Sequence, residues 1–124
     1  MDGAVHGPVR LWLRLEGLCV LAAAAYAYGR SGRSWLLFAA LFFVPDISFA
    51  GYAAGPRAGA IVYNLAHSYA GPLVLGVAAA ATGTTLAWAL IWTAHIGFDR
   101  AMGYGLKYPS AFADTHLGRI GRGR

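Results

Sequence analysis

Charged side chains are scarce in this sequence. Asp, Glu, Lys and Arg make up 12% of the 124 residues, whereas hydrophobic residues make up 58%. A soluble domain of this size exposes much of its surface to water and needs a larger polar share. The few charges lie almost all outside the apolar segments or at their ends. This distribution excludes an ordinary water-soluble domain and indicates that several segments lie in a bilayer.

Cysteine and acidic residues are also few. Cys19 is the single cysteine, so one chain can build neither a disulfide framework nor a thiolate metal site. Five acidic residues face ten basic ones, which gives a net charge of +5. The basic residues are spread over connections and the C-terminal region, without a basic face interleaved with aromatics. We therefore expect no nucleic-acid partner and take the lipid bilayer, with its anionic headgroups, as the counter-charge.

The apolar residues group into four segments that predict membrane-crossing helices. A helix of 18 residues is about 27 Å long, which roughly matches the hydrocarbon thickness. Pro45 interrupts the second segment and either kinks or ends its helix before Asp46, while Gly71 and Pro72 kink or split the third. The predicted fold class is all-α, a polytopic transmembrane bundle of about four crossing helices at residues 11–28, 35–54, 58–81 and 86–102.

Lys and Arg residues predict the orientation of this bundle. Eight of the ten fall in the N-terminal region, the second connection and the C-terminal region, which an even number of crossings places on one side. The positive-inside rule then puts both termini of a multi-pass inner-membrane protein in the cytoplasm. We expect a single integral membrane domain over residues 1–124, with a short cytoplasmic N-terminus at 1–10 and a basic interfacial tail at 103–124.

A few ionisable residues interrupt the apolar segments. Such a side chain costs several kcal/mol in hydrocarbon unless it is paired or faces water, so each is a functional candidate. At about 1.5 Å per residue, all lie roughly 5–14 Å from the cytoplasmic ends of their predicted helices, in one layer of the membrane. They are Glu16, Asp46, His67, His95 and Asp99.

Two imidazoles and two carboxylates of this layer form a sensible ligand set for Zn²⁺ or a related divalent ion. His95 and Asp99 are four residues apart and share a helix face. We expect the metal ligands to be Asp46, His67, His95 and Asp99, and we expect no organic cofactor. Singly, each residue also has a structural explanation, such as a hydrogen bond or a helix cap.

Two other features have alternative explanations. Glu16 could pair with Arg14 at the headgroups or with Arg100 across helices. Tyr104, Lys107 and Tyr108 are either interfacial anchors or parts of a flap over the cytoplasmic mouth of the site.

Two blocks of the sequence resemble a known family. PDISFAGYAAGPRAGAIVYNLAHSY (45–69) and AHIGFDRAMGYGLKYPSAFADTHLGRIG (94–121) are similar to small bacterial membrane proteins grouped as domain of unknown function 4260. The order Pro-Asp, His-Ser, His-x-x-x-Asp and Tyr-Pro is more distantly similar to the YdjM-like membrane-bound metal-dependent hydrolases. That similarity implies the same four ligands. Ser48 stands where those proteins usually carry a second carboxylate, and Val62 and Tyr63 stand where they carry His-Arg.

These observations lead to several functional hypotheses. The first is a membrane-embedded metal-dependent hydrolase of a lipid or other amphiphile, with Asp46 or Asp99 as general base. The second is a proton- or cation-handling transport or binding protein, for which four short helices suggest a homo-oligomer packed through Ala- and Gly-rich faces. The others are bis-histidine haem ligation by His67 and His95, which leaves the two carboxylates unused, and an accessory membrane protein without catalysis.

Overall fold

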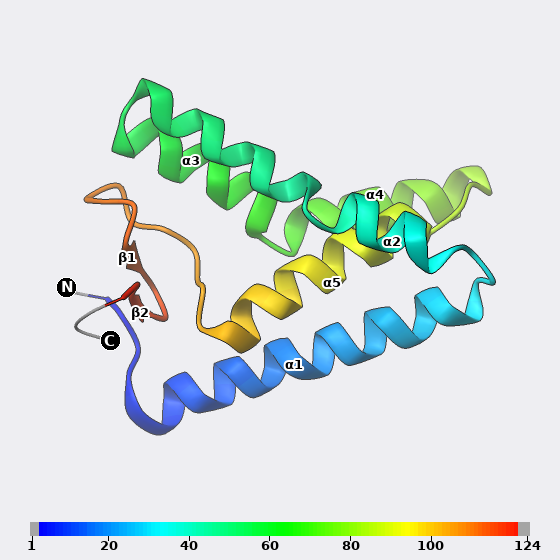
Figure 1. Cartoon of the computed structure of the whole chain (residues 1–124), viewed down its shortest axis with the longest axis horizontal. Helices are drawn as coiled ribbons and strands as arrows, with labels where there is room; N and C mark the ends of the chain where they lie inside the picture. The colour runs from blue at the N-terminus through cyan, green and yellow to red at the C-terminus, as the bar shows by residue number, and fades with distance from the viewer. Residues whose placement is uncertain (1–2, 122–124) are drawn as a thin grey trace.

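The computed structural model describes residues 3–121, and it confirms the all-α class. The chain runs back and forth along one direction, and α3 and α4 together make one passage (Figure 1). The elements are α1 (Gly7–Arg30), α2 (Trp35–Phe42), the 3₁₀ helix η1 (Val44–Ala54), α3 (Pro56–His67), α4 (Ala70–Thr82), α5 (Ala87–Met102), β1 (Asp114–Thr115) and β2 (Gly118–Arg119).

Close backbone contact joins α1 to α5, the most extensive helix pair. A Cβ atom added to Gly17 would lie 2.4 Å from Cβ of Arg100, and one added to Gly97 would lie 2.7 Å from the Gly17 carbonyl oxygen. Only glycine fits at both positions. Small residues that let helix backbones approach are typical of packing in membranes, where water does not drive helices together.

Pro45 ends α2, as the sequence predicts. Proline has no amide hydrogen to continue the helix, and α2 stops at Phe42. The chain then tightens into η1, where the Asp46 amide donates to the Phe43 carbonyl at 3.0 Å. This change of helix type places Asp46 in the first turn of η1, beside the middle of the bundle.

The third passage, for which the sequence left a kink and a split open, consists of two helices, α3 and α4, with a bend of 41° between them. The interruption lies at Ser68 and Tyr69, just before Gly71 and Pro72. Pro72 cannot donate to the Ser68 carbonyl, so α3 ends at His67, and Pro72 falls in the first turn of α4, where no donor is needed.

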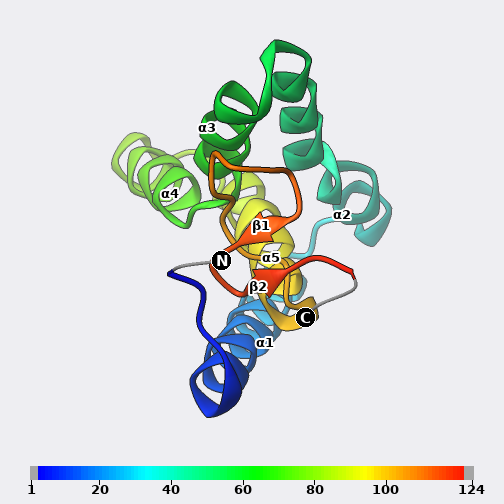
Figure 2. The ribbon, with the colours of Figure 1, turned by 90° about the vertical axis from the view of Figure 1, so that its left-hand side faces the viewer.

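Helix α5 lies near the centre of the bundle when the molecule is viewed end on (Figure 2). It follows a turn in which Gly83 adopts φ +71°, and it contacts α1, α2 and α4. Two passages of the described chain, Gly7–Arg30 and Trp35–Ala54, are long and apolar enough to cross a membrane, and the bent pair of α3 and α4 is a third candidate if it crosses as one span. With 16 residues, α5 spans about 24 Å and is shorter than these candidates, so the fourth predicted crossing stays a prediction.

The segment after α5 folds back over one end of the bundle. Its β1–β2 hairpin was not predicted from the sequence. Asn64 holds this segment through both backbone groups of Lys107, at 2.8 and 2.7 Å. The Val5 amide donates to the His116 carbonyl at 2.9 Å, so both ends of the described chain lie together. That placement fits an even number of crossings, while the cytoplasmic orientation stays a prediction.

Candidate metal centre

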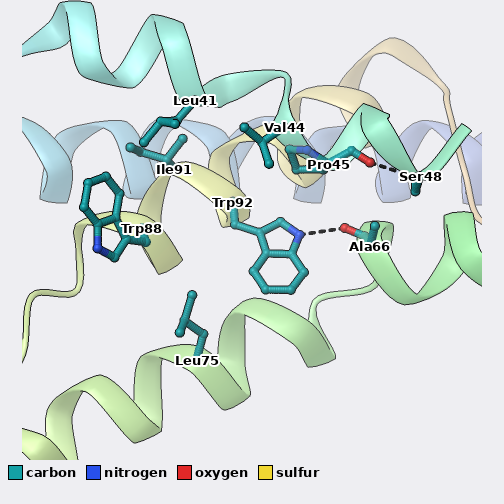
Figure 3. Close-up of a pocket in the computed structure, with 9 residues that line it drawn as sticks. All are labelled: Leu41, Val44, Pro45, Ser48, Ala66, Leu75, Trp88, Ile91 and Trp92. Carbon is teal, nitrogen blue, oxygen red and sulfur yellow. Dashed lines mark hydrogen bonds between the residues drawn. The ribbon is translucent and has the colours of Figure 1, made fainter. Parts of the chain in front are cut away.

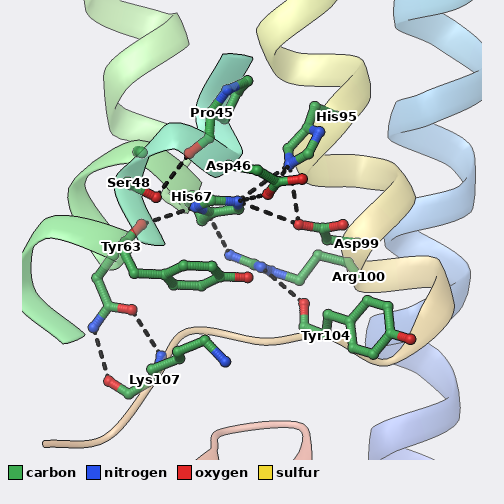
Figure 4. A network of polar contacts seen from close by, with 12 residues as sticks. Pro45, Asp46, Ser48, Tyr63, His67, His95, Asp99, Arg100, Tyr104 and Lys107 are labelled. Atoms are coloured by element: carbon green, nitrogen blue, oxygen red, sulfur yellow. Dashed lines mark hydrogen bonds and ion pairs between the residues drawn. The ribbon is translucent and has the colours of Figure 1, made fainter. Parts of the chain in front are cut away.

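Four side chains from three passages meet beside the middle of α5 (Figure 4). They are the four predicted ligands: Asp46 from η1, His67 from the end of α3, and His95 and Asp99 from α5. The two Nε2 atoms are 3.1 Å apart. Oδ1 of Asp46 lies 3.2 Å from each Nε2, and Oδ2 of Asp99 lies 3.4 Å from that of His67 and 3.2 Å from that of His95.

These separations match the edges of a tetrahedral coordination shell. Nitrogen and oxygen donors about 2.0–2.2 Å from a tetrahedral ion lie about 3.3–3.6 Å from one another. The five separations here range from 3.1 to 3.4 Å, and all four donor atoms lie within 4.8 Å of one another. The group can therefore hold one metal ion through one atom of each residue.

The surroundings of His67 fix which nitrogen faces the cluster. Its Nδ1 lies 2.9 Å from the Tyr63 carbonyl oxygen, which can only accept, so Nδ1 carries the hydrogen. Nε2 of the neutral ring then presents a lone pair, as a metal ligand must. The Tyr63 ring stacks on the imidazole, with centroids 3.7 Å apart and planes 7° apart.

Burial differs among the four ligands. The His67 and His95 side chains are 0% and 1% exposed, and Asp99 is 11% exposed, whereas Asp46 is 32% exposed. Nδ1 of His95 is buried and completes no hydrogen bond with the described part of the chain. Asp46 is thus the ligand that solvent or a substrate reaches most easily.

Arg100 holds one ligand of the cluster in position. Its buried guanidinium donates to the carbonyl of His67 at 2.7 Å and to that of Tyr104 at 3.2 Å. The first bond holds the last residue of α3 against α5, so Arg100 positions His67. From the sequence, Arg100 lies near the end of a predicted helix. Its position next to Asp99 does not show that its side chain points into the bundle.

A cavity of about 370 Å³ opens beside the cluster. Asp46, His95 and Asp99 contribute its charged and polar wall, and Tyr104 and Lys107 line it from the C-terminal segment. These two residues therefore lie at the site, while a flap over its cytoplasmic mouth stays a prediction. Tyr108 instead donates from its hydroxyl to the Gly3 carbonyl at 2.8 Å.

Lys107 also lines this cavity, and the sequence did not predict that this residue is buried. It is 4% exposed, although it follows the predicted membrane segments. Burial lowers the pKa of its ammonium group to about 8, and the Asp99 carboxylate partly opposes that shift. A tertiary contact with Asn64 that spans 43 residues and a bridge to Thr115 hold its backbone in place.

Glu16 does not join the cluster. Its side chain is exposed on α1. Neither predicted partner forms an ion pair with it within 4.0 Å, because Arg14 donates to the Ala101 carbonyl and Arg100 to the carbonyls described above. Both pairing predictions for Glu16 are wrong.

A second cavity, of about 350 Å³, has a different character (Figure 3). Its walls are almost entirely apolar, and the Trp92 indole donates to the Ala66 carbonyl at 2.6 Å. It has no ionisable side chain to hold an ion or move a proton. The lining residues are Leu41, Val44, Pro45, Ser48, Ala66, Leu75, Trp88, Ile91 and Trp92.

The geometry argues against haem ligation. Axial imidazoles of a haem lie on opposite faces of the macrocycle. Here the two Nε2 atoms are 3.1 Å apart and share their space with two carboxylates, so a macrocycle does not fit between them.

Comparison with known proteins identifies a family but no activity. No curated protein and no solved structure matches the chain. The more distant similarity to YdjM-like hydrolases gains no support from these comparisons and stays a prediction. Residues 10–120 match the family described as Domain of unknown function (DUF4260), which includes all four residues of the cluster. The chain belongs to this family.

Proposed function

We propose that the protein is a membrane-embedded metal-dependent hydrolase that acts on an amphiphile. The observation that supports this proposal most strongly is the group of four donor atoms at tetrahedral spacing, beside a cavity large enough for part of a ligand. Two imidazoles and two carboxylates are a ligand set that suits Zn²⁺ or a related divalent ion. We place the protein in the inner membrane with both termini in the cytoplasm.

The four residues divide into fixed and exchangeable ligands. His67, His95 and Asp99 are the three more buried members, and they would hold the ion as catalytic sites do, with three protein ligands. Asp46 is more exposed and lies on a 3₁₀ turn. When bound, the ion would polarise a phosphoryl or carbonyl oxygen and lower the pKa of coordinated water.

Asp46 would also act as the general base. Its carboxylate lines the cavity, where it can accept the proton of an attacking water molecule. Asp99 is the less exposed carboxylate and serves mainly as a ligand. This division assigns the general-base role to the more accessible of the two predicted catalytic carboxylates.

The rim of the cavity supports an amphiphilic substrate. Phe43, Phe49, Phe98 and Phe112 line the cavity, and each is also partly exposed on the surface. In a bilayer these exposed rings would contact lipid chains, so an apolar tail could reach the mouth without entering water. The charged wall then receives the head of the same molecule.

The test uses wild-type protein purified in mild detergent, stripped of metal and reloaded with Zn²⁺. Short-chain acyl esters and phosphate esters with chromogenic leaving groups serve as substrates. We expect turnover that chelation removes and Zn²⁺ restores, and Asp46→Asn should lose at least tenfold in kcat while it retains metal. Glu16→Gln, an exposed intramembrane carboxylate, is the matched control. Turnover that survives chelation, or full activity of Asp46→Asn, would contradict the proposal.

A further inference from the structure

Lys107 is a buried cation without an anionic partner. Its Nζ donates to the Phe112 carbonyl at 2.7 Å and lies 3.7 Å from the Phe112 ring centroid and 4.7 Å from that of Tyr63. No carboxylate of residues 3–121 lies within 4.0 Å of it. An ammonium group carries three donors, and a buried charge is costly when it is not paired. This position therefore favours an anion that residues 3–121 do not supply.

The ammonium group is held in a fixed relation to the metal cluster. Asn64 binds the Lys107 backbone on both sides, and the Tyr63 ring lies between the Lys107 ammonium and the His67 imidazole. Lys107 lines the same cavity as Asp46 and Asp99 (Figure 4). One ligand in this cavity can thus reach both the cluster and Nζ.

The charge of this region indicates the charge of the ligand. A divalent ion would be neutralised by the carboxylates of Asp46 and Asp99, which leaves the positive charge of Lys107 in the cavity wall uncompensated. A phosphate monoester carries about −1.5 to −2 at pH 7 and has three acceptor oxygens, whereas a carboxylate carries one negative charge and has two. A phosphate head can therefore face the Lys107 ammonium and the metal cluster at once.

The apolar lining of the cavity favours a lipid over a free anion as the ligand. The cavity carries its charges on one wall, whereas much of the remaining lining is aromatic and partly exposed. Inorganic phosphate would gain nothing from those rings. A molecule with an acyl chain would bury apolar surface against them and gain dispersion contacts.

We propose that Lys107 binds the head group of the substrate and that this substrate is a phosphate-bearing amphiphile, held between the metal cluster and the Lys107 ammonium. The inference rests on the proposed metal site, and it adds a substrate class and a specificity residue outside the four ligands. Lys107 contacts the head group and not the metal.

The test measures binding and needs no turnover. Protein loaded with Co²⁺ in neutral detergent is titrated with inorganic phosphate, short-chain phosphatidate and the matching diacylglycerol, and the visible Co²⁺ spectrum reports each ligand. We expect phosphatidate to bind more tightly than inorganic phosphate and diacylglycerol to leave the spectrum unchanged. Lys107→Met should weaken phosphatidate binding about 10–100-fold, the usual effect of losing a hydrogen bond to a charged group.

Two further variants separate charge from folding. Lys107→Arg keeps the cation and should retain most of the affinity. Arg57→Met removes an exposed cation in the first turn of α3 and should bind phosphatidate like the wild type. Equal Co²⁺ content in all four proteins shows that the cluster is intact in each.

The outcomes distinguish this inference from the proposed function. Wild-type affinity in Lys107→Met at full Co²⁺ content would overturn the role of Lys107 and leave the metal site standing. Equal affinity for phosphatidate and inorganic phosphate would overturn the proposal that the ligand is an amphiphile. Failure of the wild type to bind Co²⁺ would overturn both proposals together.

Discussion

The two halves of α5 are buried in opposite kinds of surroundings. In the first half, Ala87 and Ile91 pack with Tyr28 in a wholly apolar cluster. In the second half, His95, Asp99 and Arg100 are buried as well. One helix therefore carries both a region that only stabilises the bundle and a region that packing alone does not explain.

The two halves differ in the free-energy cost of burying their side chains. Apolar burial in the first half needs no partner. A charged residue at the centre of a membrane helix costs about 2.5–3.5 kcal/mol even on the mildest scale, so the second half is expensive unless its charges are matched. Carbonyl groups accept hydrogen bonds from Arg100, and the divalent cation that we propose would satisfy the two carboxylates and two imidazoles together. The polar half of α5 is therefore where we expect the function of the protein to lie.

The largest expected effect is loss of stability when metal is removed. At free metal a thousand times the dissociation constant, binding stabilises the folded state by about 4 kcal/mol. Chelation should therefore lower the melting temperature of the wild type clearly in a thermal scan. His67→Ala should no longer respond to chelation, whereas His6→Ala, which removes an exposed imidazole, should respond like the wild type. An unchanged wild-type melting temperature would contradict the account.

The next effect comes from the apolar half of α5. Ile91→Ala leaves a cavity beside Tyr28 and should reduce the free energy of unfolding by about 3 kcal/mol. Metal content per folded chain should not change, because the Ile91 side chain packs in the apolar cluster with Tyr28 and Ala87. Denaturation in mixed micelles and elemental analysis of the same sample check both points. Loss of metal in this variant would show that the two halves are not independent.

A smaller effect is expected where α1 meets α5. Gly97→Ala places a Cβ atom 2.7 Å from backbone atoms of α1 and should cost about 2 kcal/mol as the helices separate. Gly76→Ala is the matched control, since its Cβ would make only an ordinary contact, at 3.7 Å from Cβ of Ala89. Equal unfolding free energies for the two variants would contradict the close packing of α1 on α5.

The smallest effect is a pH dependence of anion binding. Because burial lowers the pKa of Lys107 to about 8, its ammonium group loses the proton as the pH rises through that value. Phosphatidate affinity should then fall about eightfold between pH 7.5 and 9, where the second phosphate ionisation is already largely complete. Lys107→Arg stays charged and should give a flat profile. A fall of the same size in Lys107→Arg would assign the titration to another group.

Much of the site could be predicted because hydrocarbon makes polar residues conspicuous. Asp46, His67, His95 and Asp99 stand out against apolar neighbours, and their similar depths predict that they meet. Glu16 met the same criteria, yet it lies on the outer surface of α1. Depth along a helix does not fix which way a side chain points, and α1 is apolar on most of its circumference.

The rest depends on contacts between distant segments. Pro45 and Pro72 predict the ends of α2 and α3 because proline acts locally. The β1–β2 hairpin has strands of two residues, too short for an alternating pattern. Lys107 is held at the cavity by contacts with Asn64 and Thr115, and no local signal in the sequence marks it as buried.

Elemental analysis of the purified wild-type protein shows whether the four-residue cluster binds a metal ion. The protein is prepared in mild detergent without chelators, and its divalent transition metals are measured by mass spectrometry against protein concentration. We expect close to one ion per chain, held by the cluster beside α5. Less than a tenth of an ion per chain, with no uptake of added Zn²⁺, would contradict this expectation.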